Sequence, residues 1–166
     1  MVFAAVAAAI AAIVAVYKII YNETHKARIE FENSKKTLEE VSENYENLSS
    51  AIDDVNTSLD DLDSRKETLD SLKYGSAEWR EELYGINEEF DKILSQYDNL
   101  EKGKDWYIDS SGMKQFTDKG KKKIADENEN RLNDARVAVD TATYINDSNE
   151  VAAKREEIAR TLKYSG

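Results

Sequence analysis

Apolar side chains recur at alternating steps of three and four residues from Leu38 to Leu69, and the positions between them are mostly charged or polar. Lys66 is the only polar member of this series. An a/d pattern sustained over several heptads is typical of a coiled-coil helix. Because so narrow an apolar stripe is not stable alone in water, it must pack against another helix, from the same chain or from a second copy. The predicted seam comprises Leu38, Val41, Tyr45, Leu48, Ile52, Val55, Leu59, Leu62 and Leu69.

A continuous apolar run opens the chain. No polar residue occurs from Val2 to Val16, and alanine is abundant, so the pattern predicts an apolar helix over residues 1–21. A membrane span needs about 20 apolar residues, and this run reaches that length only if Lys18 extends its amine to the interface. Either a bilayer or neighbouring copies would cover its contact residues, which are Val2, Phe3, Val6, Ile10, Ile13, Val16, Tyr17 and Ile20.

The stretch KYGSAEW predicts the end of one helix and the start of the next. Gly75 suits the left-handed conformation just past a helix end, and Ser76 suits an N-cap with Glu78 in the first turn. We therefore expect a long coiled-coil helix over residues 22–74 and a second helix over 76–100. Their short connection favours an antiparallel helical hairpin. The apolar face of the second helix comprises Leu83, Ile86, Phe90, Ile93, Leu94, Tyr97 and Leu100.

Residues 101–117 break the helical period. Short apolar or aromatic runs from Trp106 to Ile108 and from Met113 to Phe116 flank the sequence DSSG, whose glycine suits a tight turn with a positive φ. This spacing predicts a small β-hairpin. Because two short strands are barely stable alone, we expect the hairpin to pack on the helices through Trp106, Ile108 and Phe116.

The helical period returns over residues 118–166, with Thr117 or Asp118 as the cap. The polar run from Asn146 to Asn149 predicts a turn or kink, followed by a last helix from about residue 150 to 163. The expected fold class is therefore mainly α. It is a long helical hairpin or coiled coil with a small β-hairpin insertion and an N-terminal apolar helix.

Charge and composition narrow the possible functions. The net charge of −11 argues against a specific nucleic-acid site, because phosphate binding needs clustered Lys and Arg. The chain has no cysteine, and His25, its only histidine, has no partner suited to catalysis or metal binding. The acidic run Asp53–Asp63 lacks the glycine of a calcium-binding loop. We therefore expect no catalytic, cofactor-binding or metal-binding residues, and no enzymatic activity.

Two features together carry a resemblance to a known family: an alanine-rich apolar helix that runs directly into a long charged coiled coil, and the run from Leu72 to Ile124. A Gly-Ser-x-Glu-Trp helix start precedes a helix with a tyrosine near its end, and the hairpin motif IDxxGxxxFTxxG follows before a long helix. This order resembles part of the tail tape measure proteins of long-tailed bacteriophages and related prophages. Tyr97 is followed here by Asp98, whereas the family usually has proline at that position. The matching residues are Gly75, Ser76, Glu78, Trp79, Leu83, Asn87, Tyr97, Ile108, Asp109, Gly112, Phe116, Thr117 and Gly120.

The resemblance implies a structural role. Tape measure proteins are elongated helical oligomers in the lumen of the tail tube, where they set tail length, and their hydrophobic segments are linked to membrane passage of the genome. It further implies self-association through helices and a location in the virion tail. One alternative is a membrane-anchored coiled-coil spacer or interaction protein, whose C-terminal part would be cytoplasmic because positive charges follow the apolar run. A second alternative is a soluble helical partner-binding module.

Overall fold

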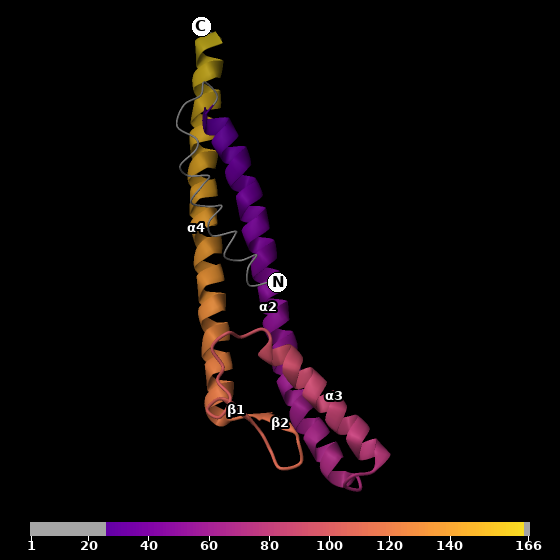
Figure 1. Cartoon of the computed structure of the whole chain (residues 1–166). Coiled ribbons are helices and arrows are strands. Elements are labelled where there is room, and N and C mark those ends of the chain that lie inside the picture. The colour runs from indigo at the N-terminus through magenta and orange to yellow at the C-terminus, as the bar shows by residue number, and fades with distance from the viewer. Residues whose placement is uncertain (1–25, 165–166) are drawn as a thin grey trace. The chain divides into compact units, whose positions relative to one another are not determined.

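The computed structural model describes residues 26–164, and this range contains three helices and two strands. Figure 1 shows them in chain order as α2 (Lys26–Ser71), α3 (Ala77–Leu94), β1 (Trp106–Ile108), β2 (Lys114–Phe116) and α4 (Asp118–Tyr164). The expectation of a mainly α protein with a small β-hairpin is therefore confirmed. The predicted apolar helix over residues 1–21, with all its contact residues, lies outside the described range. Between residues 26 and 164, no helix is both long enough and apolar enough to cross a membrane.

The chain divides into two compact units. Unit 1 comprises the residues up to Ser50 together with those from Arg131 onward, and unit 2 comprises Ala51–Asn130. Helices α2 and α4 each contribute one part to either unit, whereas α3 and the hairpin belong to unit 2 alone. The same two helices therefore meet different neighbours in the two units.

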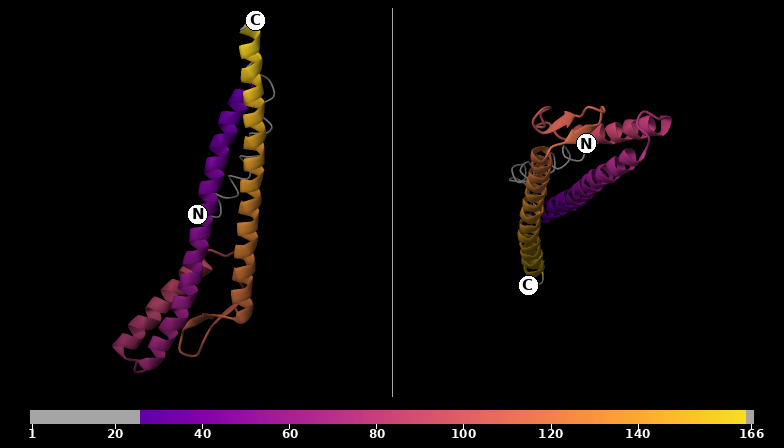
Figure 2. Two further views of the ribbon diagram at one scale, coloured as in Figure 1. Left: turned by 180° about the vertical axis from the view of Figure 1, so that it is seen from behind. Right: turned by 90° about the horizontal axis from the view of Figure 1, so that it is seen from below.

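Unit 1 pairs the first part of α2 with the second part of α4 as two antiparallel helices (Figure 2). The Ala27 N–H donates to Glu156 Oε2 at 3.2 Å, whereas Val41, farther along α2, packs on Ala138 and Ala142, which precede Glu156 on α4. These three residues form a buried apolar cluster, and Leu38, Val139 and Ile145 pack against it. Because two of its three buried members are alanines, each contact buries little apolar area.

The turn predicted at Asn146–Asn149 is wrong, because α4 is continuous through this stretch. Neither glycine nor proline occurs there, so nothing interrupts the backbone hydrogen bonds of the helix. Asn146 and Asn149 lie on the side of α4 that meets α2. The Ser34 hydroxyl is 3.2 Å from Asn146 Oδ1, and the Asn149 amide donates to Glu30 O at 3.3 Å. The polar residues that suggested a turn therefore form a polar layer between two helices.

The connection between α2 and α3 is a short turn within unit 2. Gly75 has a φ of 76°, which glycine adopts without steric strain. Ser76 is the N-cap of α3, and its hydroxyl accepts a hydrogen bond from the Trp79 N–H at 3.2 Å. Glu78 in the first turn interacts favourably with the positive end of the helix dipole. Local chemistry therefore explains where α3 begins.

Helix α3 ends at Leu94, earlier than the predicted residue 100. The Gln96 and Tyr97 N–H groups donate to carbonyls three residues back, at 3.0 and 3.1 Å, which is the tighter pattern that closes many helices. The Tyr97 side chain is buried, and its hydroxyl donates to Asn128 Oδ1 of α4 at 2.7 Å. This tertiary contact takes Tyr97 out of the helix that its spacing predicted.

The core of unit 2 is built mainly from large side chains. Phe90 of α3 is fully buried, and its ring lies 4.2 Å from that of Phe116 and 5.4 Å from that of Trp106. These two hairpin residues face each other across the antiparallel strands. One buried cluster comprises Val55, Phe90, Ile93, Tyr97, Phe116 and Ile124, and another comprises Leu69, Trp79, Ile86 and Met113.

Candidate functional site

The predicted seam of α2 is covered by other segments of the same chain. In unit 1, Leu38 and Val41 pack against alanines of α4. In unit 2, Val55 belongs to the cluster around Phe90, and Leu69 packs in the cluster that contains Trp79. All nine seam residues are buried or half-buried. Within each unit, segments of the same chain therefore pack against the seam.

The three residues predicted to pack the hairpin on the helices differ in their burial. Trp106 and Phe116 pack on Phe90, whereas Ile108 is 44 % exposed, so the prediction that Ile108 packs on the helices is wrong. Each strand has only three residues, and Ile108 pairs with Lys114 at the far end of the ladder. The Lys114 amine reaches Asp91 of α3 at 2.7 Å. An ion pair therefore occupies the position where apolar packing was expected.

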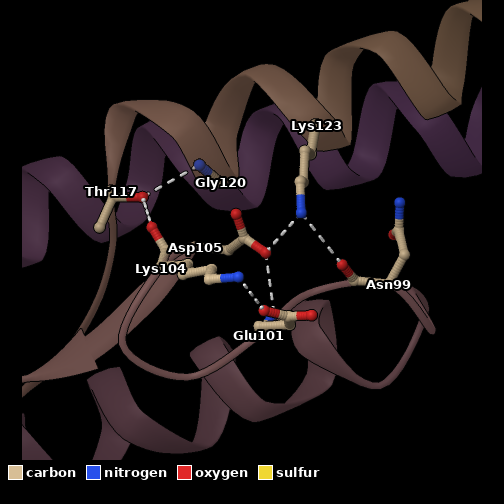
Figure 3. Close-up of polar contacts among 7 residues, drawn as sticks. All are labelled: Asn99, Glu101, Lys104, Asp105, Thr117, Gly120 and Lys123. Carbon is tan, nitrogen blue, oxygen red and sulfur yellow. Dashed lines mark hydrogen bonds and ion pairs between the residues drawn. The ribbon is translucent and has the colours of Figure 1, made fainter.

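The most buried ionisable group of unit 2 is Asp105, which has no exposed surface (Figure 3). It lies in the loop between α3 and β1. Its Oδ2 atom accepts hydrogen bonds from the Glu101 N–H at 2.8 Å and from the Lys123 amine of α4 at 2.9 Å. Lys123 also reaches Asn99 O at 3.5 Å. The Asp105 carboxylate therefore links the loop backbone at Glu101 to Lys123 near the start of α4.

Backbone contacts complete the Asp105 site. The Thr117 N–H donates to Asp105 O at 2.9 Å, and the Thr117 hydroxyl donates to Lys104 O at 2.8 Å. The same hydroxyl accepts from the Gly120 N–H at 3.0 Å and so caps α4. A methyl group on Gly120 would overlap the Asp105 carbonyl group. Only glycine lets the first turn of α4 approach the loop this closely (Figure 3).

The electrostatics of this site favour a charged carboxylate. The Glu101 N–H hydrogen bond and the Lys123 amine hold the pKa of Asp105 below its ordinary value, although burial acts in the opposite direction. The Oδ1 atom is buried and has no hydrogen-bond partner among the described residues. A carboxylate with a lowered pKa is a weak proton acceptor at neutral pH. The arrangement is therefore better suited to holding a loop against a helix than to acid–base chemistry.

A second polar cluster organises the hairpin turn. Asp109 Oδ1 accepts hydrogen bonds from the Ser111 N–H, the Ser111 hydroxyl and the Met113 N–H, and Oδ2 accepts from the Gln115 amide. Burial raises the pKa of Asp109, but these hydrogen bonds together lower it below its ordinary value. Asn87 of α3 donates to the Gly112 carbonyl and accepts from the Lys114 N–H, both at 2.9 Å. Its one amide therefore ties both sides of the turn to α3.

A cleft of about 430 Å³ lies in unit 2 beside the hairpin. Its apolar lining includes Ile86, Phe90 and Phe116, and its charged lining comes from α2, β2 and α4. The Lys121 amine is 3.7 Å from Asp63, and the Lys66 amine donates to Gln115 Oε1 at 3.3 Å. Asp63 and Asp118 also line the cleft, so it presents no concentrated charge of one sign to a ligand.

Sequence reasoning found the hairpin and the caps but did not single out Asp105. One signal was present, because Asp105 comes two residues after Gly103 and immediately before the aromatic strand that begins at Trp106. The partner of that aspartate, Lys123, lies in a different element, and a charged run gave no reason to choose it. Across the described part of the chain, no group of three or more His, Cys, Asp or Glu residues lies close enough to hold a metal ion.

Comparisons with protein-family models, with curated proteins and with solved structures found no match to this chain.

Proposed function

We propose that this chain is a non-enzymatic structural segment of a phage tail tape measure protein. In this role its helices belong to the scaffold that sets tail length, in the tail of the virion. The apolar residues 2–20 would be the segment able to meet a membrane.

The proposal is carried by one observation: the motif residues that resemble the family form turns, helix caps and hairpin contacts in the structure. Gly75 and Ser76 form the turn into α3, and Asn87 holds the hairpin turn. Thr117 caps α4, and Gly120 allows the loop to approach that helix. The motifs behind the resemblance therefore lie at the turns and caps of unit 2, and the tape measure function is what we infer from the resemblance.

The chemistry of the Asp105 site also supports a structural role. Its carboxylate is paired with Lys123, and its remaining contacts are to the loop backbone. The contacts of Lys123 with Asp105 and of Thr117 with Lys104 join the loop to α4, and the Glu101 N–H hydrogen bond holds the loop itself in shape. A module of this kind serves to hold helices in a defined arrangement.

Tail-length measurement tests the proposal directly. Deleting residues 36–49 and 131–144 removes two heptads from each of the paired helices of unit 1 while keeping their register. If the paired helices contribute to the length that the tape measure protein sets, tails should shorten by about 20 Å, at about 1.5 Å per helical residue. Averaged electron micrographs of purified particles give the length. The control is Glu43→Ala, an exposed position of α2, which should leave tail length unchanged.

Particle composition provides a second readout. Mass spectrometry of purified virions should detect peptides from residues 26–164. Virions that lack the chain, or tails of unchanged length after the deletion, would overturn the proposal. A chain that sediments with membranes and is released only by detergent would instead support the membrane-anchored coiled-coil alternative. A chain found in neither fraction would support the soluble partner-binding module.

A further inference from the structure

One guanidinium group binds two carboxyl groups where α3 packs on the last part of α2 (Figure 1). The Arg65 Nε–H of α2 donates to Glu82 Oε1 at 2.8 Å, and its Nη1–H donates to Glu89 Oε2 at 3.3 Å. The guanidinium lies over Gly85 of α3, where an added methyl group would displace it. Because these three charged side chains are half-buried, solvent and salt screen their interactions only in part.

A third carboxyl group lies at the same contact. Glu89 also makes a side-chain hydrogen bond with Asp61, which precedes Arg65 by about one turn of α2. A carboxylate only accepts hydrogen bonds, so two carboxyl groups can form such a bond only when one of them is protonated. Asp61 is exposed, so the pair can exchange this proton with solvent.

Carboxyl groups outnumber cations around this pair. Burial and the contact with Asp61 raise the pKa of Glu89 above its ordinary value of 4.5, whereas the hydrogen bond from Arg65 acts in the opposite direction. The pair borders a cleft of about 630 Å³ between α2 and α3. The other charged groups that line this cleft are Asp54 of α2 and Glu88 and Lys92 of α3.

We propose that Asp61 and Glu89 share one proton in acid, which makes the packing of α3 on α2 a pH-sensitive switch that tightens as the pH falls. When both groups are ionised, their like charges repel each other across the two helices. When one proton is bound, a hydrogen bond replaces this repulsion and Arg65 still pairs with Glu82.

The direction of the effect follows from proton binding. Because the pKa of Glu89 is raised in the folded state, the folded state holds this proton more tightly than the unfolded state does. The stabilisation is therefore fully present below the ordinary glutamate value, and it is lost as the pH rises through the higher folded value. The α2–α3 contact should thus be weaker at neutral pH than in mild acid.

The other side of α3 responds to pH in the opposite direction. On that side Asp91 pairs with Lys114, and Asn87 binds the hairpin turn that the Asp109 carboxylate organises. Protonation of Asp109 in stronger acid weakens this turn. Helix α3 therefore depends more on the hairpin at neutral pH and more on α2 in acid. This switch lies within unit 2 and is independent of the tail assignment.

Carboxyl-carbon NMR of the full chain tests the shared proton. Glu89 should titrate at a higher pH than Glu88, an exposed glutamate that lines the same cleft. Asp61→Asn should lower the titration midpoint of Glu89, because it removes the neighbouring like charge. Asp60→Asn, at the adjacent exposed position, is the matched control and should leave the midpoint unchanged. A midpoint equal to that of Glu88, or one that Asp61→Asn does not lower, would overturn the proposal.

Hydrogen exchange tests the effect on α3. Between pH 5 and pH 7, where Asp109 stays ionised, protection of the α3 amides should fall severalfold after correction for the intrinsic pH dependence of exchange. Glu89→Gln imitates the protonated group and should abolish this fall, whereas Glu88→Gln should retain it. Circular dichroism confirms that each variant remains helical. Wild-type protection that does not fall with rising pH would overturn the proposal, as would a helical Glu89→Gln protein that keeps the full wild-type decline.

Discussion

Units 1 and 2 contain parts of the same two helices but stabilise them by different means. Unit 1 has small apolar contacts such as Ala138 and Ala142 and a polar layer at Asn146. Unit 2 adds α3 and the hairpin, buries Phe90 between the strands and the helices, and holds Asp105 by backbone hydrogen bonds and an ion pair. Because unit 2 buries more apolar area per contact, we expect it to open less often than unit 1.

The largest expected effect is the loss of the aromatic core of unit 2. Phe90 and Leu48 are both fully buried, one in each unit. Phe90→Ala should lower the free energy of unfolding by about 3–5 kcal/mol, because it removes the ring on which Trp106 and Phe116 pack. Leu48→Ala in unit 1 should cost less, about 2–3 kcal/mol. Urea denaturation gives the energies, and hydrogen exchange assigns them to segments. A larger loss of unfolding free energy for Leu48→Ala than for Phe90→Ala would show that unit 1, and not unit 2, is the more strongly stabilised unit.

A smaller effect comes from the close approach of α4 to the loop. An alanine in a helix normally stabilises it relative to glycine by about 1 kcal/mol. Gly120→Ala should instead destabilise the protein by about 1–3 kcal/mol, because its methyl group overlaps the Asp105 backbone. The thermal unfolding temperature measures this change.

Gly85→Ala is the matched control for Gly120→Ala. Gly85 is also a helical glycine of unit 2, but its added methyl group would meet only the flexible end of the Arg65 side chain, which pairs with Glu82 and Glu89. A near-neutral effect is expected, since the gain in helix propensity offsets the displaced guanidinium. Equal losses for the two variants would show that backbone proximity at Asp105 is not what constrains unit 2.

The hydrogen bonds at the hairpin turn should contribute less to the free energy of unfolding than the close packing at Gly120. Asn87→Ala removes two hydrogen bonds to the hairpin backbone and should cost about 1–2 kcal/mol. Hydrogen exchange should accelerate at Met113 and Lys114 and remain unchanged in unit 1. Asn56→Ala, at an exposed position of α2 in unit 2, is the control. A uniform acceleration across both units would contradict the separate stabilisation of the hairpin.

The smallest expected effect is a dependence on pH that belongs to unit 2. The pKa values of Asp105 and Asp109 are both lowered, so these two groups bind fewer protons in the folded state than in the unfolded state. Their stabilisation is therefore present above the ordinary aspartate pKa of about 4 and is lost as the pH falls through the lower folded values. Burial raises the pKa of Glu89 in the same unit, which offsets part of this effect. Thermal unfolding between pH 7 and pH 2 should show this decline.

Substitution of Asp109 identifies its share of the pH dependence. Asp109→Asn should lower the unfolding temperature at pH 7 and flatten the decline in acid, because the variant side chain no longer titrates. Asp98→Asn, at an exposed position, is the control and should retain the decline. If the unfolding temperature of Asp109→Asn declined in acid as steeply as that of the wild type, Asp109 would not contribute to the pH dependence.

Local features of the chain predicted most of the secondary structure. The heptad spacing predicted α2, and Gly75 with Ser76 predicted the turn into α3. The glycine of DSSG predicted the hairpin, where Gly112 has a φ of 90°. These features act over a few residues, through backbone conformation and hydrogen bonds to near neighbours, so they can be recognised without knowledge of the fold.

Contacts between distant segments decided the rest. Tyr97 leaves the helical period to reach Asn128, and Asn146 stays in a helix, where it faces Ser34. The ion pair of Asp105 with Lys123 joins a loop to a helix. Each of these outcomes depends on which groups are buried together, and burial is a property of the assembled chain. Periodicity therefore showed that the seam must be covered, whereas only the tertiary structure showed which segments of the same chain pack against it.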